Sequence, residues 1–300
     1  MTASLTNSTI KQYESSLRYW WFFCQKENFN PYSADEQTIL RCLTRKFSDG
    51  ANYSSLNTMR SAIALINNQS NSDSNLLQRF FKGIYKLRTP APRYNFTWDV
   101  SIVLDTLANR NPIESLDLRQ LSLKLTMLLA LRSSFRMQSI ALIKTDNIKF
   151  NNQGVEIKID ELIKTSRPGA PLPYAWFPFF REKPQLCIAQ TLLHYLEKTK
   201  LIRKDCKNLL LSFKEPHKPI GSQTISRWLK MIMEEAGVDE VFKLYSTRHA
   251  STSKASQADL DINSIKNAAG WSQRTSTLAK FYNKPIKRTS ENFAKAVFSN

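Results

Sequence analysis

The sequence predicts a mainly α-helical protein of two domains that carries one small antiparallel β-sheet. Three observations predict this class. Apolar residues recur at helical spacing through most of the chain. Alternating apolar and polar residues, separated by turn residues, occur in one stretch between residues 141 and 178. A segment with two prolines at residues 89–97 interrupts the helical pattern, and a chain of 300 residues is long enough for about two domains.

Residues 1–88 are predicted to form a bundle of four or five short helices. Helical segments are expected at residues 6–28, 33–48, 54–69 and 75–88. The second segment starts with a capping box of Ser33 and Glu36, and a Ser- and Asn-rich loop is expected at residues 67–75. Basic side chains line these segments: Lys11, Arg18, Arg41, Arg45, Lys46, Arg60, Lys82, Lys86 and Arg88. Residues 89–97, "TPAPRYNFT", then favour an extended linker.

Residues 98–300 are predicted to form a second, larger domain. It begins with a strongly apolar helical region at residues 113–136. A sheet or hairpin follows in "ALIKTDNIKF", "GVEIKIDELIKT" and "APLPYAWFP". Further helices are expected at residues 186–202, 221–237, around Arg248, at 261–269 and at 289–298.

The charge of the chain indicates a polyanionic partner. Lys and Arg number 43 against 25 Asp and Glu, which gives a formal charge of +18 spread along the sequence. A folded, aromatic-containing protein of this charge is typically built to bind nucleic acid. No apolar run is long enough to span a bilayer, and the polar N-terminal residues lack a signal-peptide pattern.

Other composition signals exclude whole classes of site. The 4 cysteines show no CxxC spacing, so we expect free thiols in a reducing compartment and no zinc site. The 7 glycines form no GxGxxG or GxxxxGK[ST] motif, so nucleotide-driven chemistry has no support.

Four stretches of the second domain contain candidate catalytic residues, and their order along the chain is informative. They are "LLALRSSFRMQSIAL" with Arg136, "IDELIKTSRPG" with Lys164, "LYSTRHAS" with Arg248 and His249, and "AAGWSQRTSTLAKFYNKPI" with Trp271 and Tyr282. In this order they resemble the catalytic boxes of the tyrosine recombinase, or phage integrase, family. The resemblance covers residues 98–300 by motif and implies a helical, DNA-clamping core-binding domain for the residues before them. The high Asn and Ser content looks closer to mobile-element recombinases, Crypton-like or related, than to bacterial chromosome-dimer resolvases.

The resemblance implies site-specific DNA strand cleavage and rejoining through a 3′-phosphotyrosine intermediate. Tyr282 would attack the phosphorus, so the linkage conserves the bond energy and neither ATP nor a cofactor is needed. Arg136 and Arg248 would stabilise the charge that grows on the phosphate, without a metal, because guanidinium groups grip two oxygens at once. Lys164 would donate a proton to the leaving 5′ oxygen.

Three further residues would complete the site, and the pattern departs from the family in places. His249 would handle a proton or donate to the phosphate, and the indole of Trp271 would donate to it. Tyr245 stands three residues before Arg248, where the family usually has His, and its hydroxyl can still bind phosphate. Ser139 stands where many relatives carry an acid that orients the first arginine. The Gly-Trp pair also lies two residues further from the tyrosine than the family spacing.

Neighbouring residues compete for two of these roles. Arg132 lies one helical turn before Arg136 and is the alternative phosphate clamp, while Arg136 could simply cap the preceding helix. Lys158 and Arg167 are the alternatives to Lys164.

The segment "PIGSQTISRWLKMIMEEAG" looks like the family helix that enters the DNA major groove. A few of its side chains would read base edges, while the many Lys and Arg residues contact phosphates. The candidates are Ser222, Gln223, Thr224, Ser226, Arg227 and Lys230.

The resemblance also implies an assembly on double-stranded DNA. Strand exchange needs four subunits, so we expect a homotetramer on DNA and allow a monomer when the chain is free. In the C-terminal helix, Phe293, Val297 and Phe298 share one face, which would dock in a neighbouring subunit or pack on its own domain. We expect the protein inside the cell on DNA, in the nucleus of a eukaryote or the nucleoid of a prokaryote. Two alternatives stay open: a recombinase-derived DNA-binding protein that no longer cuts, and a relaxing enzyme similar to type IB topoisomerases.

Overall fold

A computed structural model describes residues 5–68, 74–91, 94–133, 135–163, 166, 169, 172–268 and 284–286. The chain divides into two compact units, residues 1–93 and 94–300, here called the amino-terminal and carboxy-terminal units. Residues 94–97, which the sequence analysis assigned to the linker, belong to the carboxy-terminal unit, where Tyr94 and Thr97 are buried.

The amino-terminal unit contains four described helices around one core. They are α1 (Asn7–Glu27), α2 (Glu36–Ser48), α3 (Tyr53–Ile66) and α4 (Asn75–Leu87). The core gathers Trp20, Cys24, Leu43, Leu56 and Leu77 from all four helices. Polar side chains that accept a hydrogen bond from the first turn start each helix, namely Thr6, Asp35, Asn52 and Ser74.

The predicted capping box of Ser33 and Glu36 is wrong. Asp35 is the N-cap residue of α2, and its carboxylate Oδ1 accepts a hydrogen bond from the Thr38 backbone N–H at 2.8 Å. A carboxylate at this position also complements the positive end of the helix dipole. Hydrogen bonds from the Thr38 side chain and backbone hold the pKa of Asp35 below its ordinary value.

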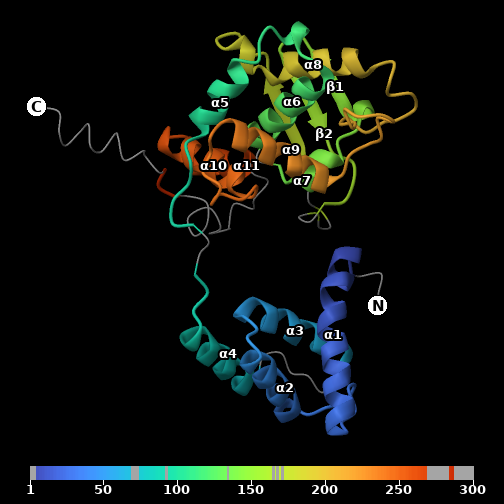
Figure 1. The fold of residues 1–300 in the computed structure, drawn as a ribbon, viewed down its shortest axis with the longest axis vertical. Helices are drawn as coiled ribbons and strands as arrows, with labels where there is room; N and C mark the ends of the chain where they lie inside the picture. The colour runs from blue at the N-terminus through green and yellow to red at the C-terminus, as the bar shows by residue number, and fades with distance from the viewer. Residues whose placement is uncertain are drawn as a thin grey trace, which may run out of the picture. The chain divides into compact units, whose positions relative to one another are not determined.

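The carboxy-terminal unit is built around the buried helix α6 (Leu118–Arg132), which Figure 1 shows running through its middle. Every residue from Leu121 to Leu131 is buried. Helix α6 contacts four other helices of the unit, α7, α8, α9 and α10. The described helices of this unit, with their 3₁₀ turns, are α5 (Val100–Ala108), η2 (Ile113–Ser115), α6, α7 (Met137–Ala141), η3 (Thr145–Asn147), η4 (Pro184–Leu186), α8 (Ile188–Thr199), α9 (Ser222–Glu235), α10 (Ser246–Gln257) and α11 (Ile262–Ala268).

The helical region expected at residues 113–136 is interrupted in two places. Asp117 and Gln120 form a reciprocal capping box that starts α6 after the η2 turn. At the other end, α6 stops at Arg132, and the Ser133 hydroxyl accepts a hydrogen bond from the Phe135 backbone N–H at 3.1 Å. The serine hydroxyl therefore offers this backbone an alternative to continuing the helix.

A three-stranded antiparallel sheet confirms the predicted fold class. Strands β1 (Ile148–Asn151), β2 (Gly154–Lys158) and β3 (Tyr174–Pro178) pair in chain order. Gly154 faces Pro178 across the sheet, and a Cβ atom at Gly154 would lie 2.3 Å from the Phe177 carbonyl oxygen. Only glycine allows the two strands to approach so closely. Among the described residues, no helix has the length and apolar character needed to cross a membrane.

Candidate active site

Helix α10 carries the arginine and histidine that the sequence analysis singled out. Arg248 is 3% exposed and His249 is 7% exposed, both in the first turn of the helix. Tyr245 precedes the helix and is 52% exposed, and the edge of its ring meets the His249 ring at a centroid distance of 5.4 Å. The structure therefore brings the Tyr245 and His249 rings together and buries Arg248, the residue before His249, in the first turn of α10.

Contacts with the start of the carboxy-terminal unit hold α10 in place. The buried Trp98 indole N–H donates to the Ser246 hydroxyl at 2.9 Å. The Lys254 ammonium lies 3.3 Å from the Asp99 carboxylate. Although burial alone would raise it, hydrogen bonds from Ser101 and Lys254 hold the pKa of Asp99 below its ordinary value. Within α10 itself, the Thr252 hydroxyl donates to the Arg248 carbonyl at 2.7 Å.

Arg136 is not near the end of a long helix, as expected, but begins the short helix α7. It is the N-cap residue of α7 and is half-buried, while its rival Arg132 ends α6 and is exposed. Helix α10 packs against α6, and α7 follows α6 after a short connection. Arg136 and Arg248 are thus each carried by a helix that contacts α6. Ser139 lies buried within α7.

Lys164, Trp271 and Tyr282 lie outside the described residues. Lys164 falls in the connection between β2 and β3, where Ser166 donates from its backbone N–H to the Ile163 carbonyl at 2.9 Å. Its rival Lys158 forms an ion pair with Glu156 at 2.8 Å, and this partner raises the pKa of Lys158. A raised pKa makes Lys158 a poorer proton donor. Arg167 also lies outside the described residues.

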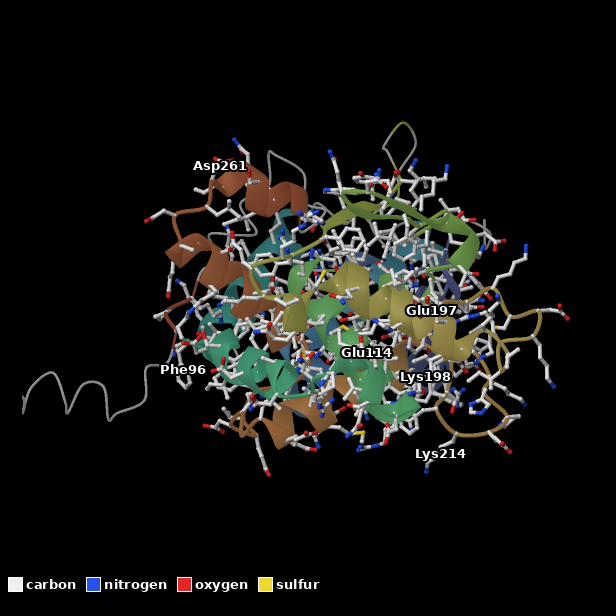
Figure 2. All side chains as sticks on the ribbon, turned by 90° about the horizontal axis from the view of Figure 1, so that it is seen from above. Phe96, Glu114, Glu197, Lys198, Lys214 and Asp261 are labelled. Atoms are coloured by element: carbon white, nitrogen blue, oxygen red, sulfur yellow. The ribbon has the colours of Figure 1, made fainter. Side chains whose placement is uncertain are left out.

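The other two histidines have local structural roles. His194 on α8 lies between two carboxylates, with its Nε2 3.3 Å from Glu114 and its Nδ1 3.8 Å from Glu197. Glu114 and Glu197 lie in the same part of the molecule in Figure 2, away from the Asp261 end of α11. The Nδ1 of His217 lies 2.9 Å from the Ser212 carbonyl oxygen within one loop. Of the three, His249 alone shares a helix with Arg248.

Helix α9 presents a polar face opposite its buried one. Ile225, Trp228 and Leu229 are buried, and Trp228 stacks on Phe213 with ring centroids 5.0 Å apart. The six predicted DNA-reading residues avoid the buried face. Gln223, Arg227 and Lys230 are exposed, and Ser222, Thr224 and Ser226 are half-buried.

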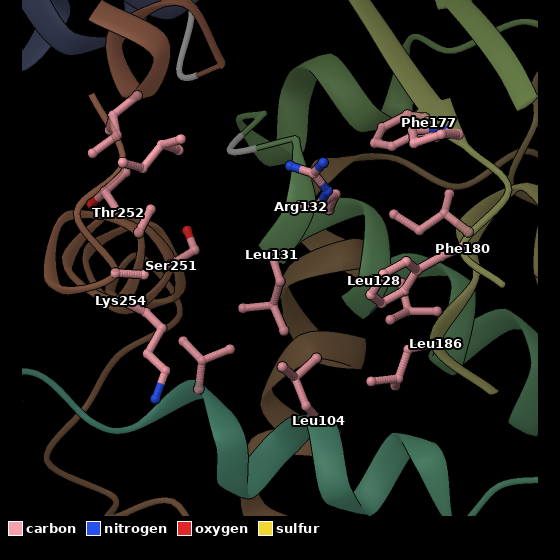
Figure 3. A pocket seen from close by; sticks show the side chains of 17 residues that line it. Leu104, Leu128, Leu131, Arg132, Phe177, Phe180, Leu186, Ser251, Thr252 and Lys254 are labelled. Carbon is pink, nitrogen blue, oxygen red and sulfur yellow. The ribbon is translucent and has the colours of Figure 1, made fainter. Parts of the chain in front are cut away.

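An apolar cavity of about 480 Å³ lies between α5, α6, α10, α11 and the end of β3. Figure 3 shows Ser251, Thr252 and Lys254 of α10 on one side and Phe177 and Phe180 on the other. Leu104, Leu128 and Leu131 line the space between these two sides, and Arg132 reaches it from the end of α6. No motif in the sequence indicated this cavity, because its lining comes from separate elements.

A family model described as Phage integrase family matches residues 103–288. The match covers more than half of the chain and includes all seven predicted catalytic positions, from Arg136 to Tyr282. The chain belongs to the phage integrase family. By class it is therefore a tyrosine site-specific DNA recombinase. No curated protein matches the chain.

Solved structures share the fold of this phage integrase family member at low sequence identity. The Tn1549 transposon integrase in complex with transposon right end DNA is similar, with a TM-score of 0.61 and 14% identity over 98% of this chain and 94% of that one. The XerH site-specific recombinase bound to difH substrate has a TM-score of 0.56 and 14% identity over 89% and 72%. A lambda integrase dimer bound to a COC′ core site has a TM-score of 0.54 and 14% identity over 95% and 91%.

Proposed function

We propose that this protein cuts and rejoins DNA at specific sites through a 3′-phosphotyrosine intermediate. The observation that carries the proposal is the arrangement on α10, where Arg248 and His249 are buried and the His249 ring contacts the Tyr245 ring, within the region that the family model matches. We also propose that it serves a mobile element and acts inside the cell, on DNA. The fold it shares with a transposon integrase supports this proposal.

In the proposed reaction the Tyr282 phenolic oxygen attacks the phosphorus as the bond to the 5′ oxygen breaks. The phenol passes its proton to a base, for which His249 is the candidate, and Lys164 donates a proton to the leaving 5′ oxygen. Rejoining reverses these transfers. Neither step consumes a nucleotide, because the protein–DNA ester retains the energy of the broken bond.

Arg248 and Arg136 would stabilise the negative charge of the transition state. Burial keeps the Arg248 guanidinium in one orientation and away from bulk water. In such a buried site its attraction to a phosphate is stronger than in water. Arg136 would grip the same phosphate from the start of α7. The Tyr245 hydroxyl and the Trp271 indole N–H would add hydrogen bonds to the phosphate oxygens.

A suicide substrate tests the cleavage step. A duplex with a nick close to the cut releases a short strand after attack, so the covalent complex accumulates. We expect an adduct with the wild-type chain and none with Tyr282→Phe, which removes only the hydroxyl. DNA from the adduct, once sequenced, gives the cut position and its flanking repeats.

The second candidate is a DNA-binding protein that has lost cleavage, and the departures at Tyr245 and Ser139 favour it. It predicts site-specific DNA binding by the wild-type chain without an adduct on the same substrate. That outcome would reject the cleavage proposal.

Recognition of the target is assigned to α9 and to the amino-terminal unit. The exposed Arg227 and Lys230 and the half-buried hydroxyls of α9 lie on a face free of core residues, as major-groove contacts require. The Lys and Arg residues of the amino-terminal unit would bind phosphates and clamp the duplex.

We further propose that four subunits assemble on DNA and that residues 289–298 of one subunit, where the sequence predicts a helix and which lie outside the described residues, occupy the apolar cavity of its neighbour. The cavity is lined mainly by apolar side chains, and Phe293, Val297 and Phe298 would give residues 289–298 a matching face. Light scattering of the DNA complexes tests this. Removing residues 289–300 should leave DNA binding intact and abolish the tetramer, whereas a tetramer that survives the truncation would reject the docking.

A further inference from the structure

Residues 284–286 are tied by their backbone to two other segments of the carboxy-terminal unit. The Lys284 backbone N–H donates to the hydroxyl of Ser253 on α10 at 3.0 Å. The Pro285 carbonyl accepts from the Thr97 backbone N–H at 2.9 Å, and Ile286 forms a parallel bridge with Thr97. The Lys284 ammonium also donates to the Tyr94 carbonyl. Four contacts thus fix a short segment near the end of the chain.

The segment that holds residues 284–286 is itself firmly anchored. The Tyr94 hydroxyl accepts a hydrogen bond from the Lys243 backbone N–H at 2.7 Å, and its ring lies 5.4 Å from the Phe242 ring. The Trp98 indole is buried and bonds Ser246 at the start of α10. Residues 94–98 therefore form a brace between the segment that leads into α10 and residues 284–286.

Both ends of this brace are linked to the same helix, α10: Trp98 bonds Ser246, and Lys284 bonds Ser253. Ser253 lies four residues after His249, one helical turn further along α10. Lys284 lies two residues after Tyr282, and two residues of chain span at most about 7 Å. The hydrogen bond between Ser253 and Lys284 therefore limits how far the Tyr282 backbone can lie from the helix that carries Arg248.

We infer that Ser253 and Lys284, with Thr97 and Tyr94 behind them, are positioning residues for the Tyr282 nucleophile. We assign them no contact with the phosphate or with the reacting oxygen. Because the contacts hold the chain directly after the nucleophile, their loss lets the phenolic oxygen drift from the phosphorus while the arginine site stays intact. The inference rests on the proposed function, since it assumes that Tyr282 attacks DNA.

The inference predicts a loss of cleavage without a loss of DNA binding. Ser253→Ala removes the hydroxyl that accepts from Lys284, and Lys284→Met removes the hydrogen bond to the Tyr94 carbonyl. Misplacement of a reacting group by about 1 Å can cost about a hundredfold in rate, so we expect a drop of about ten- to a hundredfold in the rate of adduct formation. Lys284→Arg keeps a donor and should restore most of the rate. Ser256→Ala, three residues along the same helix, is the matched control and should cut at the wild-type rate.

A small external nucleophile separates positioning from general damage to the fold. In a Tyr282→Phe background, hydrogen peroxide can supply the attacking oxygen, and the same bond to the 5′ oxygen breaks. This cleavage depends on the arginines and the proton donor but not on where the tyrosine lies. We expect Ser253→Ala and Lys284→Met to leave peroxide-dependent cleavage unchanged within about twofold. Arg248→Ala should abolish it.

Two results would overturn the inference. One is wild-type rates of adduct formation by both Ser253→Ala and Lys284→Met. The other is an equal loss of tyrosine-dependent and peroxide-dependent cleavage, which would mean that the contacts support the arginine site itself. If Ser253→Ala does not fold, the comparison of Lys284→Met with Lys284→Arg decides. Failure of the wild-type chain to form any adduct is a different outcome, because it rejects the proposed function.

Discussion

Lys124 should make the stability of the carboxy-terminal unit depend on pH in a predictable way. This lysine is fully buried in α6, and its ammonium donates to the Arg110 carbonyl at 2.5 Å. Burial, with a smaller contribution from the Arg110 charge, lowers its pKa from 10.5 to about 8. Arg110 in turn pairs with Glu235 at the end of α9 at 2.5 Å, so the lysine lies where α5, α6 and α9 meet.

The sign follows from the protons bound in each state. Between pH 8 and 10.5 the unfolded chain keeps the Lys124 proton while the folded chain has released it, so the free energy of unfolding rises with pH across this window. Below pH 8 both states are protonated, and the folded state bears the full cost of a buried charge. At about 1.36 kcal/mol for each pH unit, the depressed pKa corresponds to about 3 kcal/mol.

The assay compares the wild-type chain with Lys124→Met by urea unfolding at several pH values, following the core tryptophans Trp98 and Trp228. Methionine fills a similar volume without a charge, so the contribution of Lys124 is absent from the variant. The difference in unfolding free energy between the two chains should shift by about 3 kcal/mol in favour of the wild type from pH 7.5 to 10.5. A difference that stays constant over this range would show that Lys124 keeps its ordinary pKa in the folded protein.

Three further predictions concern the site and its supports. Arg248→Lys keeps the charge but loses the planar fork of the guanidinium, so adduct formation on the suicide substrate should slow by about a hundredfold or more, with DNA affinity nearly unchanged. Adduct formation at the wild-type rate would exclude a phosphate clamp at this position. Arg227→Ala on α9 should weaken DNA binding by about 1–3 kcal/mol and relax the preference at one base position, as titrations against site variants will show, whereas an unchanged site preference with a weaker salt dependence would assign the side chain to a phosphate contact instead. Trp98→Phe leaves the buried Ser246 hydroxyl without the indole donor and should cost about 1–3 kcal/mol in thermal or urea unfolding, while an unchanged stability would show that the bond does not hold α10.

The sequence predicted the elements whose signal extends over many residues. A strongly apolar stretch marked α6, helical segments were expected at α8 and α9, and the alternation in residues 141–178 marked the sheet. Element ends were harder, because several Ser, Thr and Asp residues compete to cap one helix. Asp35 begins α2 in place of Ser33, and Ser133 ends α6 before Arg136. The residue at which a helix begins or ends depends on a single hydrogen bond, and a single hydrogen bond produces no periodic pattern in the sequence.

Part of the candidate site could be predicted from the sequence for a different reason. The family's order of catalytic residues can be recognised in a single sequence without knowledge of the fold. Here that order is Arg136, Lys164, Arg248, His249, Trp271 and Tyr282. The contacts that fix α10 have no such motif. Trp98 meets Ser246, and Ser253 meets Lys284, across long sequence separations and through single polar atoms. Only the packed structure brings such residues together.

Peptide mapping of the covalent protein–DNA complex identifies the residue that attacks the DNA. The wild-type chain is trapped on a suicide substrate and digested with a protease and a nuclease, and the peptide that retains a nucleotide is sequenced by mass spectrometry. We expect the modified peptide to contain Tyr282, linked to the 3′ phosphate of the cut strand. A nucleotide on any other residue, or an adduct that forms equally well with Tyr282→Phe, would contradict it.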